Sequence, residues 1–404
     1  MKLSEELKWR GYLNQTTFDD IKELDSKQFS LYLGTDPSGD SLHIGHLAVY
    51  MMVRRFLDHG HKVTLLIGGG TGQVGDPRDS EERELIPLDV INQNAESLAA
   101  QVKQLFGGQD FKAVNNLDWL QDVRLLDFLR DTGKHFSMGQ LVDREHFKAR
   151  VGKGKPGMSF AEFAYTLMQG YDFWYLHRNL GVNLQIGGSD QWGNILSGVD
   201  LIRKKEDVRV DGMTAPLVID KTTGRKFGKS EAGEGVWLSP DKTSPYKFYQ
   251  FWLNVGDEAA VDYLKLYTLL DKPQVDELES VMRADPGARL AQKTLAYEVT
   301  KLVHGKDKTD EVVRITGVLF GGEDFTKLDD IEVDLLAGEI PVAQTGGSLV
   351  GILLDVGVAK SNGEARRLVA SGAISVNGVK VTEDQVFFEK SLVKKGKNTF
   401  ILVR

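Results

Sequence analysis

The sequence contains no cysteine among its 404 residues. This absence excludes disulfide frameworks, thiolate metal sites and cysteine nucleophiles together. Long apolar runs are missing as well, because a run such as 63–67 is far shorter than a membrane-spanning helix requires. The first eleven residues, MKLSEELKWRG, include acidic residues that signal and transit peptides lack. These absences predict a soluble protein of the cytoplasm or of a matrix-type compartment.

Positive charge is in deficit, since 50 Lys and Arg stand against 58 Asp and Glu and give a formal net charge of −8. An acidic chain of this kind does not coat nucleic acid or acidic membranes over its whole surface, although a local basic patch remains open. The length exceeds what one hydrophobic core usually organises. The 41% hydrophobic content is typical of globular proteins, so we expect two or three folded domains.

The first half of the chain alternates short buried strands with helices. Residues 29–33 and 63–67 are predicted strands, each of which runs into glycine and then into a polar or helical stretch. Between them, apolar residues recur at helical spacing over 44–56. This pattern predicts an α/β fold with a Rossmann-like, doubly wound parallel sheet. Ligands of such sheets gather beyond the carboxyl ends of the strands, where helix N-termini offer free N–H groups.

Changes in composition along the rest of the chain predict further domains and a linker. From about residue 240 the pattern turns helical, and residues 322–344 are acidic and contain several glycines, which is typical of a linker. From residue 348 to the end, nine Lys and Arg stand against five Asp and Glu. We therefore predict a catalytic domain over 1–238, an α-helical domain over 239–321, a linker over 322–344 and a small α+β domain over 345–404. The basic tail is a first indication of a polyanionic partner.

A pair of histidines marks the start of the predicted helix, in the pentapeptide Leu42-His43-Ile44-Gly45-His46. Two imidazoles three residues apart share one face of a helix. One interpretation is a pair that caps the helix or packs against it, and the other is a pair that binds a ligand at the helix N-terminus. No third metal ligand stands nearby, which argues against a metal site. The spacing alone leaves the first two interpretations open.

A second signal is the basic stretch KTTGRKFGKSEAGEG at 221–235, whose glycines and lack of periodicity describe a loop. It contains three cations within 225–230 and is either a solvated basic loop or a phosphate-binding one. Lysine suits phosphoryl oxygens because it is a movable point charge. The stretch is not a Walker motif, since the Gly-x4-Gly-Lys spacing is absent.

A third signal is the polar stripe of Tyr165, Gln169 and Asp172, which fall at i, i+4 and i+7 of a predicted helix. The residues around them in 163–174 are mostly apolar, so this helix is expected to be buried. Buried polar groups are costly unless they are paired. The stripe therefore predicts a bound polar ligand or a closed hydrogen-bond network.

Taken together, the HIGH tetrapeptide and the KFGKS loop about 180 residues later resemble the two signatures of class I aminoacyl-tRNA synthetases. The chain resembles the bacterial-type tyrosyl-tRNA synthetases in four further segments: 32–37 (YLGTDP), 75–77 (GDP), 165–172 (YTLMQGYD) and 185–192 (QIGGSDQW). The resemblance extends from residue 9 to the C-terminus. It implies an enzyme that forms tyrosyl-adenylate and pyrophosphate from tyrosine and ATP, and then transfers the tyrosyl group to the 3′-terminal adenosine of tRNA(Tyr).

The resemblance also implies roles in a tyrosine site. Tyr32 and Asp172 would hydrogen-bond the phenolic hydroxyl of tyrosine, while its ammonium group would be held by Asp76, Tyr165 and Gln169. Phenylalanine would leave the polar groups of Tyr32 and Asp172 desolvated and unpaired, and its rejection follows from that cost.

For ATP, the resemblance assigns one set of residues to the triphosphate, namely His43, His46, Lys226, Lys229 and Ser230. It assigns Asp36, Gly188 and Asp190 to the nucleoside, and it places Gln191 at the reacting centre beside the tyrosine. A magnesium ion is expected to arrive with the ATP, since the chain shows no ligand cluster for it. The tyrosine carboxylate would attack the α-phosphorus in line, so positioning and charge stabilisation would supply the catalysis.

The C-terminal residues 360–378 resemble the αL RNA-binding motif of some ribosomal proteins and pseudouridine synthases. Within them, Asn377-Gly378 predicts a type I′ hairpin turn. The expected phosphate contacts are Lys360, Arg366, Arg367 and Lys380. The alternative is an exposed basic helix that binds no RNA.

The sequence departs from the family pattern after Gly75-Asp76-Pro77. Many family members carry a lysine in the next loop, whereas this chain offers Arg78 and Arg83, and which of the two replaces the lysine is open. Leu33 and Val49 also stand where smaller or more polar residues are common near the nucleotide. We therefore assign these two residues no contacts.

Three other functions fit parts of the sequence. A tryptophanyl-type synthetase is disfavoured because Asp172 opposite Tyr32 suits a phenol. A catalytically silent RNA-binding paralogue is expected to lose His43, His46 or Lys229, and all three are present. A metabolite nucleotidylyltransferase also uses His-x-Gly-His but does not need residues 240–404. The family resemblance further implies a homodimer joined around residues 110–155.

Overall fold

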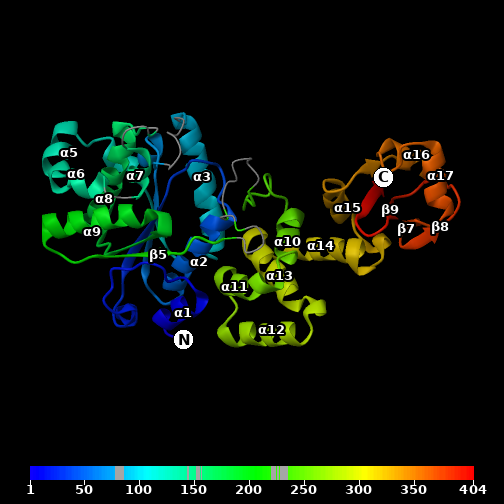
Figure 1. The fold of residues 1–404 in the computed structure, drawn as a ribbon, viewed down its shortest axis with the longest axis horizontal. Helices are drawn as coiled ribbons and strands as arrows, with labels where there is room; N and C mark the ends of the chain where they lie inside the picture. Colours follow the sequence, from blue (N-terminus) through cyan, green and yellow to red (C-terminus); the bar gives the residue numbers. More distant parts are fainter. Residues whose placement is uncertain are drawn as a thin grey trace. The chain divides into compact units, whose positions relative to one another are not determined.

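The computed structural model describes residues 1–77, 86–142, 145–151, 155, 157–219, 224, 227 and 235–404. These residues form two compact units, whose course along the chain can be followed by colour in Figure 1. The first unit joins Met1–Ser244 with Phe251–Val303, and the second joins Pro245–Gln250 with His304–Arg404. Within the described ranges, no helix combines the length and the apolar character that crossing a membrane requires.

The first unit is built on a parallel five-stranded sheet with the strand order β3-β2-β1-β4-β5. Its strands are β1 (Ser30–Thr35), β2 (Lys62–Ile67), β3 (Lys112–Asn115), β4 (Leu184–Gly188) and β5 (Asp211–Ala215). The middle residues of the central strands are mostly apolar and buried, as expected of a parallel sheet covered by helices on both faces. The predicted strands at 29–33 and 63–67 and the predicted α/β fold class are confirmed.

In the described part of 1–244, these strands are preceded or followed by the helices α1 (Leu3–Arg10), α2 (Ile44–Asp58), α3 (Leu88–Leu105), α4 (Leu117–Leu120), α5 (Leu125–Asp131), α6 (Met138–Val142), α7 (Glu145–Arg150), α8 (Phe160–Leu180) and α9 (Trp192–Glu206). Helix α2 packs on β2, and α9 packs on β4 and on α8. Helix α2 confirms the predicted helix at 44–56. A Ser159 capping box begins α8, and Gly181 in the left-handed conformation ends it.

The strand order reverses between β1 and β4, which are neighbours although the chain visits β2 and β3 between them. In open α/β sheets such a switch point leaves a crevice at the carboxyl ends of the two strands. Asp36 directly follows β1, and Gly188 is the last residue of β4. The topology therefore places two predicted site residues at this crevice.

A helical segment follows the sheet and comprises α10 (Pro245–Leu253), α11 (Asp257–Tyr267), α12 (Lys272–Ala284) and α13 (Leu290–His304). Helix α11 packs on α1 and α2, and the buried Arg10 side chain donates to the carbonyl oxygens of Lys265, Thr268 and Leu270. These contacts fasten α11 to the first unit. The compact units thus divide the segment 239–321 between them, and the predicted domain boundaries stay a prediction.

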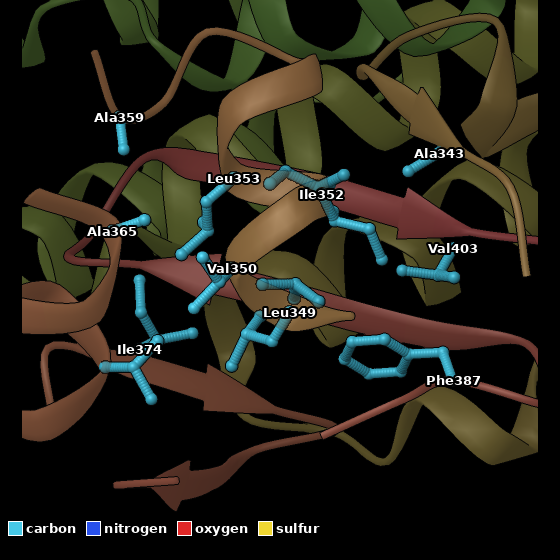
Figure 2. Packing of buried hydrophobic residues seen from close by; sticks show 13 residues of the cluster. Ala343, Leu349, Val350, Ile352, Leu353, Ala359, Ala365, Ile374, Phe387 and Val403 are labelled. Atoms are coloured by element: carbon cyan, nitrogen blue, oxygen red, sulfur yellow. The ribbon is translucent and has the colours of Figure 1, made fainter. Parts of the chain in front are cut away.

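The second unit contains α14 (Lys306–Thr316), α15 (Asp330–Ala337), α16 (Leu349–Asp355) and α17 (Asn362–Ala370) beside a mixed sheet. The sheet has the order β6-β10-β9-β7-β8, with β6 (Val342–Ala343), β7 (Ile374–Val376), β8 (Val379–Val381), β9 (Ser391–Lys395) and β10 (Thr399–Val403). Figure 2 shows α16 inserting Leu349 and Leu353 among apolar side chains such as Ile374 and Phe387. This packing confirms the predicted small α+β fold.

The stretch 322–344, predicted as a linker from its acidity and glycines, contains α15 and β6. Val333 and Leu336 of α15 are buried in a cluster with Phe400 and Leu402 of β10. The acidic residues that suggested a linker include Asp329 and Glu332, which form the capping box that begins α15. These acids therefore specify a helix start in a packed segment.

Candidate active site

A cavity of about 320 Å³ lies in the first unit and includes the carboxyl ends of β1 and β4 in its walls. Its lining contains eleven of the predicted site residues: Tyr32, Asp36, His43, His46, Asp76, Tyr165, Gln169, Asp172, Gly188, Asp190 and Gln191. The side chains predicted for a phenol and those predicted for a nucleotide therefore share one cavity. Lys226, Lys229 and Ser230 lie outside the described residues, as do Arg78 and Arg83.

Asp172 is fully buried in the cavity wall and is fixed by two hydrogen bonds. Asn116 Nδ2 donates to Asp172 Oδ2 and Trp119 Nε1 donates to Asp172 Oδ1, both at 2.8 Å. Burial raises the pKa of the Asp172 carboxyl to about 7, even though the two donated hydrogen bonds oppose this rise. The carboxylate is thus held at one position with oxygen lone pairs left for a further donor.

Tyr32 is equally buried, and its hydroxyl oxygen has no hydrogen-bond partner in the described part of the chain. Burial and then the charge of Asp172 hold the pKa of the Tyr32 hydroxyl well above its usual range, so it remains a hydrogen-bond donor. Gln169 Oε1 and Gln185 Oε1 also lack a partner there, and both residues line the same cavity. Three buried polar atoms without a hydrogen-bond partner in the described residues indicate a ligand that has polar groups of its own.

Two further carboxylates, Asp36 and Asp76, lie in the cavity wall. Asp36 accepts hydrogen bonds from Thr71 Oγ1 at 2.7 Å and from the Tyr165 hydroxyl at 2.9 Å. Burial, followed by the charges of Asp36 and Asp76, holds the pKa of the Tyr165 hydroxyl well above its usual range. Two acidic groups beside a neutral phenol favour a positively charged group of the ligand at this point.

Asp76 is held in place from α9 and the turn before it. Gln191 Nε2 donates to Asp76 Oδ2 at 2.8 Å, and Asn194 Nδ2 donates to Asp76 Oδ1 at 3.2 Å. Asn194 Nδ2 also donates to Gln191 Oε1 at 3.2 Å. This small network sets the orientation of the Gln191 amide, which lines the cavity.

The two signature histidines lie at the N-terminus of α2 with their rings stacked, the centroids 3.7 Å apart and the planes 22° from parallel. His43 Nδ1 accepts from the backbone N–H groups of Gly45 and His46, while His46 Nδ1 accepts from the backbone N–H of His43. An Nδ1 that accepts leaves the proton of a neutral imidazole on Nε2. Both histidines therefore cap the N-terminus of α2, as the capping interpretation predicted, and both rings line the cavity.

Phe227, the described residue of the KFGKS loop, lies next to the HIGH tetrapeptide at the cavity. The carbonyl oxygen of Phe227, in the KFGKS loop, lies so near Gly45 that a Cβ atom there would stand 2.3 Å from it. Phe227 also lines the cavity, and its N–H donates to the carbonyl oxygen of Val218 at 2.9 Å. Only a glycine at position 45 admits this approach between the two signatures.

Five residues to which the sequence analysis assigned no role line the cavity or hydrogen-bond its side chains, namely Thr71, Asn116, Trp119, Gln185 and Asn194. Two of them had a readable signal. Asn116 directly follows the parallel strand β3, at the strand end where ligand-facing polar groups collect, and Gln185 is a lone polar side chain in the buried strand β4. The other three are recognised through their hydrogen bonds to distant residues.

The described residues contain no group of three or more His, Asp and Glu side chains placed to hold a metal ion.

The predicted RNA contacts belong to the second unit, where Lys360, Arg366, Arg367 and Lys380 are all exposed. Arg366 and Arg367 lie on α17, and Lys380 lies on β8. The hairpin between β7 and β8 turns at Asn377-Gly378, with φ values of 47° and 83°. Positive φ at both positions confirms the predicted type I′ turn.

Comparison with known proteins places this geometry in a family. Residues 24–321 match the model of class I tRNA synthetases (W and Y), and residues 332–404 match the model of the tyrosine-tRNA ligase SYY-like C-terminal domain. The tyrosine-tRNA ligase of Limosilactobacillus fermentum is 44% identical over 419 residues, covering 100% of this chain and 99% of the relative. That of Leuconostoc citreum is 45% identical over 411 residues, covering 100% and 97%.

The fold is also similar to those of solved tyrosyl-tRNA synthetase structures. A C-terminally truncated mitochondrial tyrosyl-tRNA synthetase of Aspergillus nidulans superposes with a TM-score of 0.70 at 33% identity, covering 79% of this chain and 94% of that structure. The sequence matches over the full chain and the two matching family models lead to one assignment. The chain belongs to the tyrosyl-tRNA synthetase family of class I aminoacyl-tRNA synthetases.

Proposed function

We propose that this protein attaches L-tyrosine to tRNA(Tyr) in two steps at the cavity described above. The observation that carries the proposal is the pairing of Asp172 with the unpartnered Tyr32 hydroxyl in the buried wall of that cavity. A phenolic O–H donates to the Asp172 carboxylate and accepts from the Tyr32 hydroxyl, which satisfies both groups. Phenylalanine satisfies neither, so it is rejected by the cost of leaving them buried and unpaired.

The ammonium and carboxylate groups of the amino acid bind to side chains beside the phenol site. Its ammonium group is held by Asp76, Tyr165 and Gln169, whose carboxylate, hydroxyl and amide oxygens are suitable acceptors. The tyrosine carboxylate then lies beside Gln191, where it meets the α-phosphate of ATP. Gln191 positions the reacting groups, since its amide is fixed by hydrogen bonds to Asp76 and Asn194.

ATP occupies the other part of the cavity. Asp36, Gly188 and Asp190 hold the nucleoside, and the triphosphate is held by His43, His46, Lys226, Lys229 and Ser230. The carboxylate of tyrosine attacks the α-phosphorus, the bond to the bridging oxygen breaks, and pyrophosphate leaves with the magnesium ion that accompanied ATP. The Nε2–H groups of the two histidines donate to phosphate oxygens on which charge increases in the transition state.

In the second step, the 3′-terminal adenosine of the tRNA takes the tyrosyl group from the adenylate. We propose that Lys360, Arg366, Arg367 and Lys380 bind tRNA phosphates, supported by their exposure and by the match of residues 332–404 to the family's C-terminal domain. We also propose the functional division into 1–238, 239–321, 322–344 and 345–404, and a cytoplasmic location in keeping with the bacterial relatives.

A homodimer joined around residues 110–155 is part of the proposal. It is supported by exposed apolar side chains on and beside α5, where Leu125, Leu126 and Leu129 are 67%, 78% and 44% exposed and Met138 is 61% exposed. Such a patch is costly in water and typical of an interface. Analytical ultracentrifugation of the wild type and of Leu126→Asp tests this, since a dimer that becomes a monomer supports it and an unchanged sedimentation coefficient contradicts it.

The decisive test of the function is ATP–pyrophosphate exchange with each amino acid in turn. Tyrosine is expected to stimulate exchange, whereas phenylalanine and tryptophan are not. Stimulation by tryptophan alone would establish the tryptophanyl alternative. Binding of tRNA without any tyrosine-dependent exchange would establish the catalytically silent paralogue.

A further inference from the structure

The segment that follows the lysine loop, 235–243, lies along the residues that lead into α2. Three hydrogen bonds join the two segments: Leu238 N to Leu42 O at 2.8 Å, Ile44 N to Val236 O at 3.1 Å, and Ser239 N to the Ser41 hydroxyl oxygen at 3.0 Å. Lys242 and Asp40 add an ion pair. The chain is thereby fastened to the first signature a few residues after the second one.

Trp237 occupies the centre of this pairing, opposite His43 in a backbone bridge. Its ring meets the His43 imidazole edge to face, with centroids 5.8 Å apart and planes at 72°. Because His43 also stacks on His46, its ring contacts two aromatic neighbours. Nothing in the sequence pattern had singled out Trp237.

Trp237 is itself held firmly. Its side chain is buried, its backbone N–H donates to the Thr243 hydroxyl at 3.0 Å, and the Lys242 ammonium lies 4.9 Å from the centre of its ring. A tryptophan fixed by its own backbone and by a cation on its ring provides a rigid surface for the imidazole.

His43 needs such a surface because its helix cap alone does not determine the tilt of the ring. Of the two hydrogen bonds accepted by His43 Nδ1, the one at 3.1 Å is of ordinary length and the one at 3.4 Å is long, whereas the proposed function requires Nε2 to be aimed at a phosphate oxygen in the transition state. A misplacement of about 1 Å at a reacting centre can lower a rate by about a hundredfold. The orientation of this ring therefore bears directly on the adenylation rate.

We propose that Trp237 is a positioning residue for tyrosine adenylation, which fixes the His43 imidazole and so links the end of the lysine loop to the first signature. The proposal rests on the function given above. It predicts that Trp237 acts on the rate of the step in which triphosphate charge develops, and has no part in binding the amino acid, because Trp237 does not line the cavity.

The test is steady-state ATP–pyrophosphate exchange with the full-length protein. Trp237→Leu is expected to lower kcat on the order of tenfold while the KM for tyrosine stays within about twofold. Trp237→Phe keeps an aromatic ring and should restore most of the rate. Trp9→Leu removes a tryptophan that does not line the cavity and serves as the matched control, with no change expected.

A double-mutant cycle separates positioning from a general structural role. If Trp237 acts through His43, Trp237→Leu should cause no further loss of kcat in a His43→Ala background. An equal fold loss in both backgrounds overturns the proposal, as does a wild-type rate for Trp237→Leu alone. Should Trp237→Leu fail to fold, Trp237→Met takes its place in the same cycle. Absence of tyrosine-dependent exchange in the wild type would overturn the proposed function instead.

Discussion

The hydrogen bond from Trp119 to Asp172 is expected to control how tyrosine binding depends on pH. In the wild type the Asp172 pKa lies at about 7, so the carboxylate that we propose as acceptor of the phenolic hydrogen bond is lost as the pH falls below 7. The KM for tyrosine should therefore rise with falling pH. Trp119→Phe removes one of the two donors that stabilise the charged form of Asp172.

The size of the effect follows from that lost hydrogen bond. A hydrogen bond to a charged group contributes about 1.5–3 kcal/mol, and one pH unit corresponds to 1.36 kcal/mol. The midpoint of the KM profile should then move upward by about one to two pH units. At pH 7.5 the KM for tyrosine is expected to rise about 3- to 25-fold, whereas at pH 9 the rise should be about twofold or less.

The assay is pyrophosphate exchange at a series of tyrosine concentrations between pH 6 and pH 9. Trp174→Phe is the matched control, because Trp174 Nε1 also donates to a carboxylate, Glu206 Oε1 at 2.8 Å, but does not line the cavity. Its profile should match the wild type. A Trp119→Phe enzyme whose KM rises equally at every pH would refute the reasoning, since Asp172 would not then be the titrating group.

Three further predictions concern other parts of the molecule. His46→Ala should lower the exchange kcat by about a hundredfold and leave the KM for tyrosine nearly unchanged, as measured by steady-state kinetics. Charge reversal at Arg366 and Arg367 should spare exchange but raise the KM for tRNA in aminoacylation, and the charging rate should depend less steeply on salt. Arg150→Met should lower the free energy of unfolding by about 3–5 kcal/mol in chemical denaturation, because Glu162 is left buried without its bidentate partner.

The parts of the fold that could be predicted are those with a local pattern. The strand at 63–67, the helix at 44–56 and the polar stripe of α8 all depend on spacings within one element, and the structure reproduces them. Asn116 and Trp119 could not be assigned, because they reach Asp172 from more than 50 residues away and depend on the sheet order. Hydrogen bonds between distant segments leave no periodic signal in either one.

In the segment 322–344, composition alone could not reveal the helix α15. Acidic residues and glycines are typical of linkers, but Asp329 and Glu332 here cap a helix, and Glu332 is buried with Arg314 as its partner. A capping box and a run of solvated acids have the same composition. What distinguishes them is the apolar pair Val333 and Leu336, which faces the cluster containing Phe400.

The buried carboxyl of Asp172 lowers the stability of the empty protein at neutral and higher pH. This cost also explains how the cavity can select its ligand. The pKa of Asp172 is raised in the folded state, so the folded protein binds this proton more tightly than the unfolded chain does. At this group, stability is therefore highest below the ordinary pKa of an aspartate, decreases as the pH rises, and reaches its minimum above about 7. In the proposed function, a bound phenol donates to the carboxylate in that same pH range and offsets the cost, while it also satisfies the Tyr32 hydroxyl. An amino acid without a hydroxyl leaves the cost in place, so the instability of the empty site and its selectivity for tyrosine have one physical origin.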